Sequence, residues 1–284
     1  MNTVDLHLHS TYSDGTYTPA ELIHMAEMKG MEAIGITDHD TINHIKEVHK
    51  LGAKAKLRDV LAGVEVSAEF SSGTMHIVGY FVDPDNTDLC DMLNRFTAGR
   101  SERNPQIIEK LNALGVSITY DEVLKEANGA SVGRPHIANV MVQKGAVRSM
   151  KEAFDKYLAK GAPAYVNRTR ASSEKIIAVI KKAGGVSFLA HPRQLGVGKK
   201  KELERIVARL ADEGLDGIEA YSSSHTREDV HRYEGLAQKY QLLLSGGSDF
   251  HGLGKEHIVL GFVGAGVTLS YDIIKKMKER IKVQ

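Results

Sequence analysis

The sequence predicts an α/β fold in which seven β-strands alternate with helices and close into a barrel that carries a small helical insertion. Short apolar, β-rich segments recur along the chain, helical patterns lie between most of them, and histidines or carboxylates follow nearly every segment. The alternation predicts a parallel sheet with right-handed crossovers. Residues from so many strand ends meet at one point only if the sheet closes, because the outer strands of an open sheet lie too far apart.

The first predicted strand, Val4–His9, alternates apolar and polar residues, so Asp5, His7 and His9 share one face. Two imidazoles on that face lie within reach of one metal ion. The other predicted strands are Ala33–Thr37, Leu61–Val66, Met75–Phe81, Gly185–Ala190, Gly217–Tyr221 and Leu242–Gly246.

The first predicted helix begins at Pro19, with Thr18 as its N-cap and Gly30 ending it. Similar patterns predict helices over Ser173–Lys182, Lys201–Glu213, Arg227–Tyr240 and Ser270–Arg280. The basic run Lys199–Lys201 at the start of one helix is interpreted as a solvated face.

Between residues 99 and 168 the alternation stops, and no strand is predicted. Helical patterns there cover Asn104–Leu114, Tyr120–Ala127, Pro135–Lys144 and Met150–Lys160. We therefore expect residues 1–98 and 169–284 to form the barrel, and residues 99–168 to form an inserted helical subdomain that binds substrate.

Composition excludes several classes of protein. The 284 residues include 37 Lys plus Arg against 36 Asp plus Glu, so net charge gives no general attraction to nucleic acid or membrane. A single cysteine, Cys90, forms no internal disulfide and fits a reducing compartment. Neither a signal-peptide pattern nor a membrane-length apolar run is present, so a cytoplasmic location is expected.

Nine side chains suited to metal binding lie in the predicted strands, shortly after them, or in the loop after the first one. Imidazole and carboxylate without cysteine favour zinc, manganese or iron, and nine such ligands suffice for three divalent ions. The nine candidate ligands are His7, His9, Asp14, His39, Glu65, His76, His191, Asp249 and His251.

The charge of such a centre predicts its substrate. Three divalent ions and three carboxylates leave about +3, which favours phosphoryl substrates over neutral amides or esters. Water bound to such ions has its pKa lowered to about 7, and this supplies an attacking hydroxide without a serine or cysteine nucleophile.

Other polar residues are expected to support the metal ligands or to lie in solvent. Asp5 and Asp38 are expected to orient metal-binding imidazoles through hydrogen bonds. The remaining histidines lie in helical or loop patterns and are expected to be solvated: His24, His44, His49, His231 and His257.

The chain resembles the polymerase and histidinol phosphatase (PHP) family. The matching motifs are Asp5–Ser10, Ser13–Gly15, Ile36–Asp40, Gly63–Glu65, Met75–Ile77, Ala190–Pro192 and Gly247–His251. The resemblance implies a distorted seven-stranded β/α barrel holding three metal ions. It also implies how the ligands divide: His7, His9, Glu65 and Asp249 on one ion; Asp14, His39 and His251 on another; Glu65, His76 and His191 on a third.

Within the family, the inserted motif Ser131–Ala138 resembles the branch that removes the 3′-phosphate from nucleoside 3′,5′-bisphosphates, whose relatives also trim RNA from its 5′ end. Pro135 suits a helix start, whose free N–H groups attract anions, and Arg134 can grip phosphate. Arg134 and His136 are therefore candidate substrate contacts, and Arg193, His225 and Lys160 are further candidates.

Three other functions compete with this prediction. A histidinol-phosphate phosphatase would not need the Arg134 motif. A non-catalytic metal-binding scaffold of a polymerase disagrees with the complete ligand set. A DNA exonuclease lacks the basic stripe that tracks a duplex. The predicted partner is a small phosphorylated nucleotide or short RNA, and no stable protein partner is implied.

Overall fold

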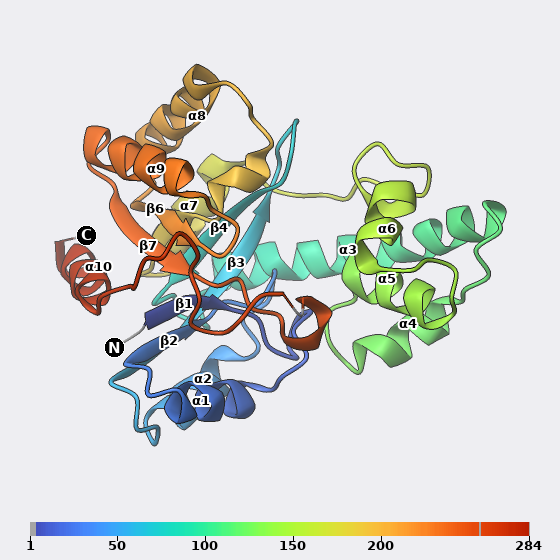
Figure 1. Ribbon diagram of the computed structural model, residues 1–284, viewed down its shortest axis with the longest axis horizontal. Coiled ribbons are helices and arrows are strands. Elements are labelled where there is room, and N and C mark those ends of the chain that lie inside the picture. Colours follow the sequence, from blue (N-terminus) through green and yellow to red (C-terminus); the bar gives the residue numbers. More distant parts are fainter. Residues whose placement is uncertain (1–3, 256, 284) are drawn as a thin grey trace.

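Seven strands form one sheet in the order β1 to β7, and the sheet closes into a barrel (Figure 1). The computed structural model describes residues 4–255 and 257–283. Closure occurs just beyond β7, where Asp249 N donates to His7 O and His9 N donates to Phe250 O, each at 3.0 Å. The strands are β1 (Val4–Leu8), β2 (Ala33–Ile36), β3 (Asp59–Ala68), β4 (Met75–Tyr80), β5 (Val186–Leu189), β6 (Gly217–Ser222) and β7 (Leu243–Gly247).

The expectation of a wholly parallel sheet is wrong at one strand, because β4 is antiparallel to both β3 and β5. Only residues 69–74 join β3 to β4. A parallel connection needs a crossover of a dozen or more residues, so this short link forces a reversal. The reversal distorts the regular barrel, as the family resemblance implied.

Helices cover the outside of the barrel. Helix α1 begins as expected: Thr18 Oγ1 accepts from Glu21 N, and the Glu21 carboxylate accepts from Thr18 N in return. The sequence analysis did not predict α2, a short helix. The barrel helices are α1 (Pro19–Met28), α2 (Ile45–Gly52), α7 (Ser173–Lys182), α8 (Lys200–Asp212), α9 (Arg227–Lys239) and α10 (Asp272–Val283).

The insertion lies to one side of the barrel and has its own apolar core, to which Leu111, Ile137 and Met141 contribute. Its helices are α3 (Thr87–Ala113), α4 (Tyr120–Ala127), α5 (Arg134–Gln143), α6 (Met150–Ala153) and a π-helical turn, η1 (Phe154–Leu158). Helix α3 starts well before the expected Asn104 and runs through Pro105. The expected boundary of the insertion at residues 98–99 therefore falls within α3.

Among the described residues, no helix is both long and apolar enough to cross a membrane.

Barrel closure depends on a close approach between β7 and β1 that only glycine allows. A Cβ on Gly247 would lie 2.3 Å from His7 Cβ and 2.4 Å from His7 N. We expect Gly247→Ala to lower the free energy of unfolding by about 1–3 kcal/mol, because the strands must separate. Thermal or denaturant unfolding measures this loss.

The control is the same substitution at Gly235, inside α9, where a Cβ meets no atom within 4 Å. Gly235→Ala should stabilise the protein by about 0.5–1 kcal/mol, since alanine favours the helix. Equal stability of the two variants would show that the approach of β1 and β7 is not tight.

Candidate metal centre

The nine candidate ligands all lie at one end of the barrel. His7 is in β1 and His9 follows it; His39 follows β2, and Asp249 and His251 follow β7. His76 stands at the start of β4, but because β4 is antiparallel, its start lies at the same end as the finish of β3 and β5. The reversed strand thus still delivers its histidine to the centre.

Glu65 lies at the middle of the centre, fully buried. Its Oε2 is 3.2 Å from His7 Nε2, 3.2 Å from His9 Nε2 and 2.9 Å from His39 Nδ1. Its Oε1 is 2.7 Å from both His76 Nδ1 and His191 Nε2. One carboxylate is therefore surrounded by five imidazoles from four different segments of the chain.

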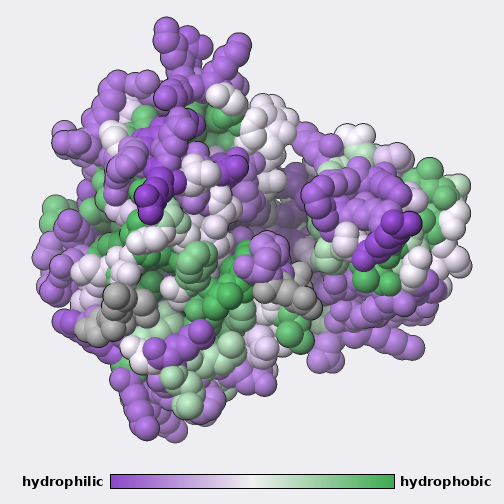
Figure 2. Space-filling model, viewed as in Figure 1, coloured by the Kyte–Doolittle hydropathy of each residue, from purple (hydrophilic) through white to green (hydrophobic). Residues whose placement is uncertain are grey.

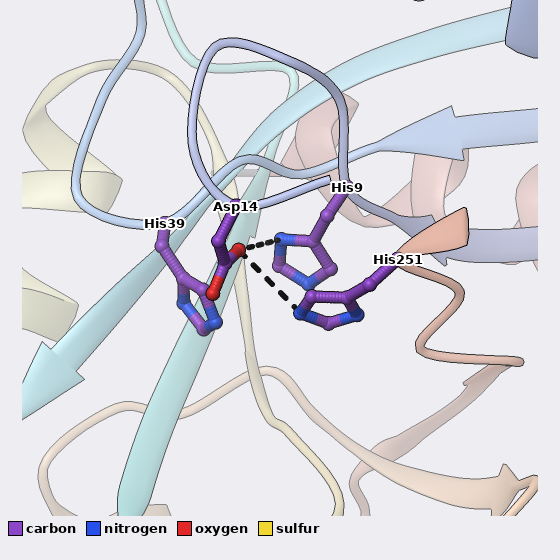
Figure 3. A group of neighbouring side chains, drawn as sticks. All are labelled: His9, Asp14, His39 and His251. Carbon is purple, nitrogen blue, oxygen red and sulfur yellow. Dashed lines mark ion pairs between the residues drawn. The ribbon is translucent and has the colours of Figure 1, made fainter. Parts of the chain in front are cut away.

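A second group lies beside the first and consists of His9, Asp14, His39 and His251 (Figure 3). Asp14 Oδ1 is 3.9 Å from His9 Nδ1 and 3.5 Å from His251 Nε2. The ring of His9 stacks on that of His251, with centroids 4.0 Å apart. Asp14, on the loop after β1, thus reaches the same centre as the strand-end residues.

Mutual distances sort the candidate atoms into three groups, with all atoms of a group within 4.8 Å of one another. The group of His7, His9, Glu65 and Asp249 has the membership that the resemblance implied. The group with Asp14 also includes His9, so His9 faces two groups. His39 joins Glu65 and His76 in the third group, although His191 Nε2 also contacts Glu65.

Divalent metals fit this donor set. Among the described residues, His7 Nε2, both ring nitrogens of His9, His39 Nδ1 and Glu65 Oε2 are buried without a hydrogen-bond partner. Each such group costs about 1–3 kcal/mol if it stays unsatisfied, and unsatisfied groups are rare in folded proteins. Ions held between these atoms would satisfy all of them at once.

The pKa values of two groups suit metal binding. Burial lowers the pKa of His76 to about 4, and His39 and His191 add to this effect against the carboxylate of Glu65. Its ring is therefore neutral at pH 7, with a lone pair free to bind a metal. Burial would raise the pKa of Glu65, but His39, His76 and His7 hold it well below its usual range, so Glu65 is ionised.

A residue that orients the imidazole of His7 is Glu219, in β6, which the sequence analysis missed. Its Oε1 lies 3.0 Å from His7 Nδ1, and its Oε2 accepts a 2.6 Å hydrogen bond from His191 N. The signal was present, because Gly217-Ile218-Glu219 repeats the pattern of Gly63-Val64-Glu65 on another strand.

Asp5 and Asp38 do not orient the candidate ligands' imidazoles as expected. Asp5 accepts from the backbone N of Ser248 and Gly261, which ties β1 to the segment after β7. Asp38 accepts from the hydroxyls of Ser10 and Ser13 and thereby fixes the loop that carries Asp14.

One of the five histidines expected to be solvated is buried. His44 is fully covered, with Nε2 3.3 Å from Ile36 O and Nδ1 3.3 Å from Asp38 Oδ2. Its place at the start of an unpredicted helix explains the error. The other four, His24, His49, His231 and His257, are exposed as expected, and so is Lys199–Lys201.

Two candidate ligands adopt left-handed backbone conformations, His191 with φ 25° and Asp249 with φ 59°. Such conformations are costly for residues other than glycine and tend to occur at functional sites. Both turn the chain sharply just after a strand, which brings their side chains to the centre. Lys255 Nζ, 3.0 Å from Asp249 Oδ2, adds a cation that the sequence analysis did not identify.

A cavity of about 860 Å³ connects the centre to the insertion. Figure 2 shows the hollow between the two parts, with hydrophilic residues around it. Asp14, His39 and His76 line one part of its wall. Six arginines also line it. One is Arg209 of α8, and the other five are here called the arginine cluster: Arg100, Arg103, Arg134, Arg168 and Arg170.

Two of the five candidate substrate contacts, Arg134 and Lys160, line this cavity. The other three are held by different contacts. His136 Nδ1 accepts from Gly133 N at the start of α5, Arg193 pairs with Asp229 on the surface, and His225 Nδ1 bonds to Ala220 O. Four arginines of the cluster were missed because they form two pairs, Arg100 with Arg103 and Arg168 with Arg170, that lie far apart in sequence without a shared motif.

A closed α/β barrel with a histidine and carboxylate cluster at the strand ends defines a metal-dependent hydrolase. Residues 5–212 match the PHP domain family, so the chain belongs to that family. The chain is 36% identical to the 3′,5′-nucleoside bisphosphate phosphatase of Chromobacterium violaceum, over 90% of this chain and 89% of that protein.

Two further comparisons support the family and the fold. The 5′-3′ exoribonuclease Rnm of Escherichia coli is 34% identical, over 87% of this chain and 84% of its own length. A solved structure, described as an amidohydrolase from Chromobacterium violaceum with bound sulfate and no metal, superimposes with a TM-score of 0.89 at 33% identity, covering 98% of this chain and 96% of that one. The chain is a phosphoric ester hydrolase of the metal-dependent phosphoesterase type.

Glu219 offers a test of the metal centre that leaves every candidate ligand in place. We expect Glu219→Gln to weaken metal binding about tenfold to a hundredfold, because an amide orients His7 less firmly than a carboxylate does. Titration of the purified apoprotein with Mn²⁺ or Zn²⁺ measures the affinity.

Glu234→Gln is the matched control, since Glu234 accepts from Tyr221 OH away from the centre. It should bind metal like the unaltered protein. Equal affinity in the two variants would mean that Glu219 does not support the ligands.

Proposed function

We propose that this protein hydrolyses the 3′-phosphate of nucleoside 3′,5′-bisphosphates, with three divalent ions held by the nine candidate ligands. The proposal rests on one observation. Residues of the candidate metal centre and of the arginine cluster line the same cavity. A substrate with two phosphates can place one at the metal centre and the other among the arginines.

The arginine cluster carries little compensating negative charge. Arg100 and Arg168 pair with Asp40, while no other ion pair to the cluster is found among the described residues. Burial, aided by the neighbouring arginines, lowers the pKa of Arg103 to about 8. Arg103 has no carboxylate partner in the described part of the chain; its guanidinium donates to the side-chain oxygen of Asn104. A bound phosphate would relieve the repulsion among these cations.

Arg134 is held in place before any substrate binds. Its guanidinium donates to Leu158 O at 2.8 Å and lies over the rings of Phe154 and Tyr165, 5.7 and 5.5 Å from their centroids. Fixing a guanidinium in advance lowers the entropy lost on binding an anion. We assign Arg134 to the phosphate that is not cleaved.

When bound, the divalent ions supply positive charge at the scissile phosphate and lower the pKa of water to about 7. The protein's own residues position the metal-binding groups and the substrate. Glu65 and Glu219 fix the surrounding imidazoles, and the arginine cluster holds the second phosphate. The overall reaction breaks the P–O bond to the 3′-oxygen and adds water oxygen to phosphorus.

Short 5′-phosphorylated RNA is a second candidate substrate. The relative in Escherichia coli is named an exoribonuclease, and the cavity is at the large end of the usual range for small-molecule sites, about 300–1,000 Å³. Histidinol phosphate is a poorer fit, because it has no second phosphate to bind the arginine cluster. A non-catalytic scaffold would not need that cluster.

The direct test is phosphate release by protein reconstituted with Mn²⁺, Fe²⁺ or Zn²⁺. We expect kcat/KM for adenosine 3′,5′-bisphosphate to exceed that for histidinol phosphate by tenfold or more, since one charge-assisted contact is worth about 1.5–3 kcal/mol. Assays with a short 5′-phosphorylated RNA in parallel rank the second candidate. A preference for histidinol phosphate would contradict the proposal.

The assignment of Arg134 has its own test. Arg134→Ala should lower kcat/KM for the bisphosphate by roughly tenfold to a hundredfold, because a charge-assisted contact is lost. A simple phosphate monoester should lose much less, since it has no second phosphate. Steady-state kinetics on both substrates measure these losses in kcat/KM, and unfolding curves exclude misfolding.

Arg148→Ala is the control, because Arg148 is an exposed arginine of the insertion outside the cavity wall. Its kinetics should match those of the unaltered protein. Equal losses on both substrates in Arg134→Ala would place Arg134 at the scissile phosphate or in the fold.

A further inference from the structure

Asp40, directly after the candidate ligand His39, is buried and accepts hydrogen bonds from four donors. Its Oδ1 accepts from Ser67 N at 2.8 Å, and its Oδ2 accepts from Ser67 Oγ at 3.0 Å, from Arg168 Nη2 at 2.7 Å and from Arg100 Nη2. Its backbone is left-handed, with φ 53°, and its N donates to Glu65 O. The carboxylate is thus fixed by the barrel on one side and binds two arginines on the other.

The two arginines come from opposite ends of the insertion. Arg100 lies in α3, on the way out of the barrel, and Arg168 lies between η1 and α7, on the way back. Both line the cavity, and both side chains are mostly buried, 12% and 4% exposed. A single barrel carboxylate therefore fixes two cationic side chains of the cavity wall.

Each arginine has donors left over. A guanidinium carries five N–H groups, and Asp40 accepts through only one nitrogen of each arginine. Among the described residues, Arg100 Nε and Arg168 Nη1 are buried without a hydrogen-bond partner. Buried donors without a partner are costly, and an anion in the cavity would satisfy them.

Asp40 also counters repulsion within the arginine cluster. The five arginines of the cluster line the same cavity, and without a nearby anion their like charges repel one another. The Asp40 carboxylate pairs with both Arg100 and Arg168, so it holds two of the arginines together in the absence of substrate.

We propose that Asp40 is a positioning residue for substrate selectivity: it fixes Arg100 and Arg168 so that their free N–H groups bind the phosphate that is not cleaved. The inference rests on the proposed function and extends it to residues outside the Arg134 motif. Asp40 itself does not contact the substrate; it acts through the two arginines.

The test is equilibrium binding of adenosine 5′-phosphate, which has no 3′-phosphate to cleave, followed by kinetics on adenosine 3′,5′-bisphosphate. Asp40→Asn should weaken binding of the monophosphate about tenfold or more, because an amide releases the arginines. On the bisphosphate it should raise KM by a similar factor and change kcat less than twofold. A fall in kcat with unchanged KM would mean that Asp40 acts through His39, which overturns the proposal.

Glu69→Gln is the matched control. Glu69 lines the same cavity, is exposed, and forms no ion pair with the described residues. The substitution removes the same charge without touching the arginines, so binding should change less than twofold. Equal effects of Asp40→Asn and Glu69→Gln would show that charge alone matters and would overturn the positioning role.

A double-mutant cycle separates an effect of Asp40 that acts through Arg100 and Arg168 from a direct effect of Asp40 on ligand binding. In a protein that already carries Arg100→Lys and Arg168→Lys, Asp40→Asn should weaken binding little further. The two lysines keep the charge and the fold but lose the planar donors, so they should reproduce the tenfold loss even if Asp40→Asn fails to fold. Additive losses would overturn the proposal.

The outcome also separates this inference from the proposed function. If the unaltered protein releases no phosphate from the bisphosphate, the proposed function fails. Binding of adenosine 5′-phosphate can still depend on Asp40 in that case, and the positioning role then stands. If hydrolysis is selective and binding is indifferent to Asp40, only the positioning role fails.

Discussion

Closure of the sheet between β1 and β7 is the constraint on which the rest of the structure depends. His7, in β1, and Asp249, after β7, are 242 positions apart in sequence, yet Asp249 N donates to His7 O. Glycine at position 247 permits this approach, because any side chain there would collide with His7. Closure brings the strand ends close together. Imidazoles from several strand ends then surround the carboxylate of Glu65.

The barrel and the insertion each supply a different kind of charged site. The barrel end concentrates histidines and carboxylates whose buried atoms lack partners, and this arrangement is stable with bound cations. The insertion concentrates arginines with a single paired carboxylate, Asp40, and this arrangement is stable with a bound anion. The substrate proposed above, with two phosphates on one sugar, would place one phosphate at each of these charged sites, because both line the same cavity.

Local sequence patterns explain why much of the fold and site was predictable. Apolar runs ending in His7, Glu65, His191 or Asp249 predicted strands that each deliver one polar group, and the family and fold expected on that basis are confirmed. The errors have physical causes: β4 is reversed because its connection is short, and α3 continues through Pro105. Glu219 was overlooked although Gly217-Ile218-Glu219 repeats the pattern of Gly63-Val64-Glu65, because the pattern alone does not show that the carboxylate contacts His7.

The sequence by itself determined which residue types stand at strand ends, where helices start, and hence the class of chemistry, because these follow from spacing within a few residues. Only the tertiary structure decided which of those groups meet. Arg100 and Arg168 are 68 positions apart and share no motif, yet both bind Asp40 because the insertion leaves and re-enters the barrel beside it. Contacts between distant segments depend on how the closed barrel and the insertion pack, and no local pattern encodes that packing.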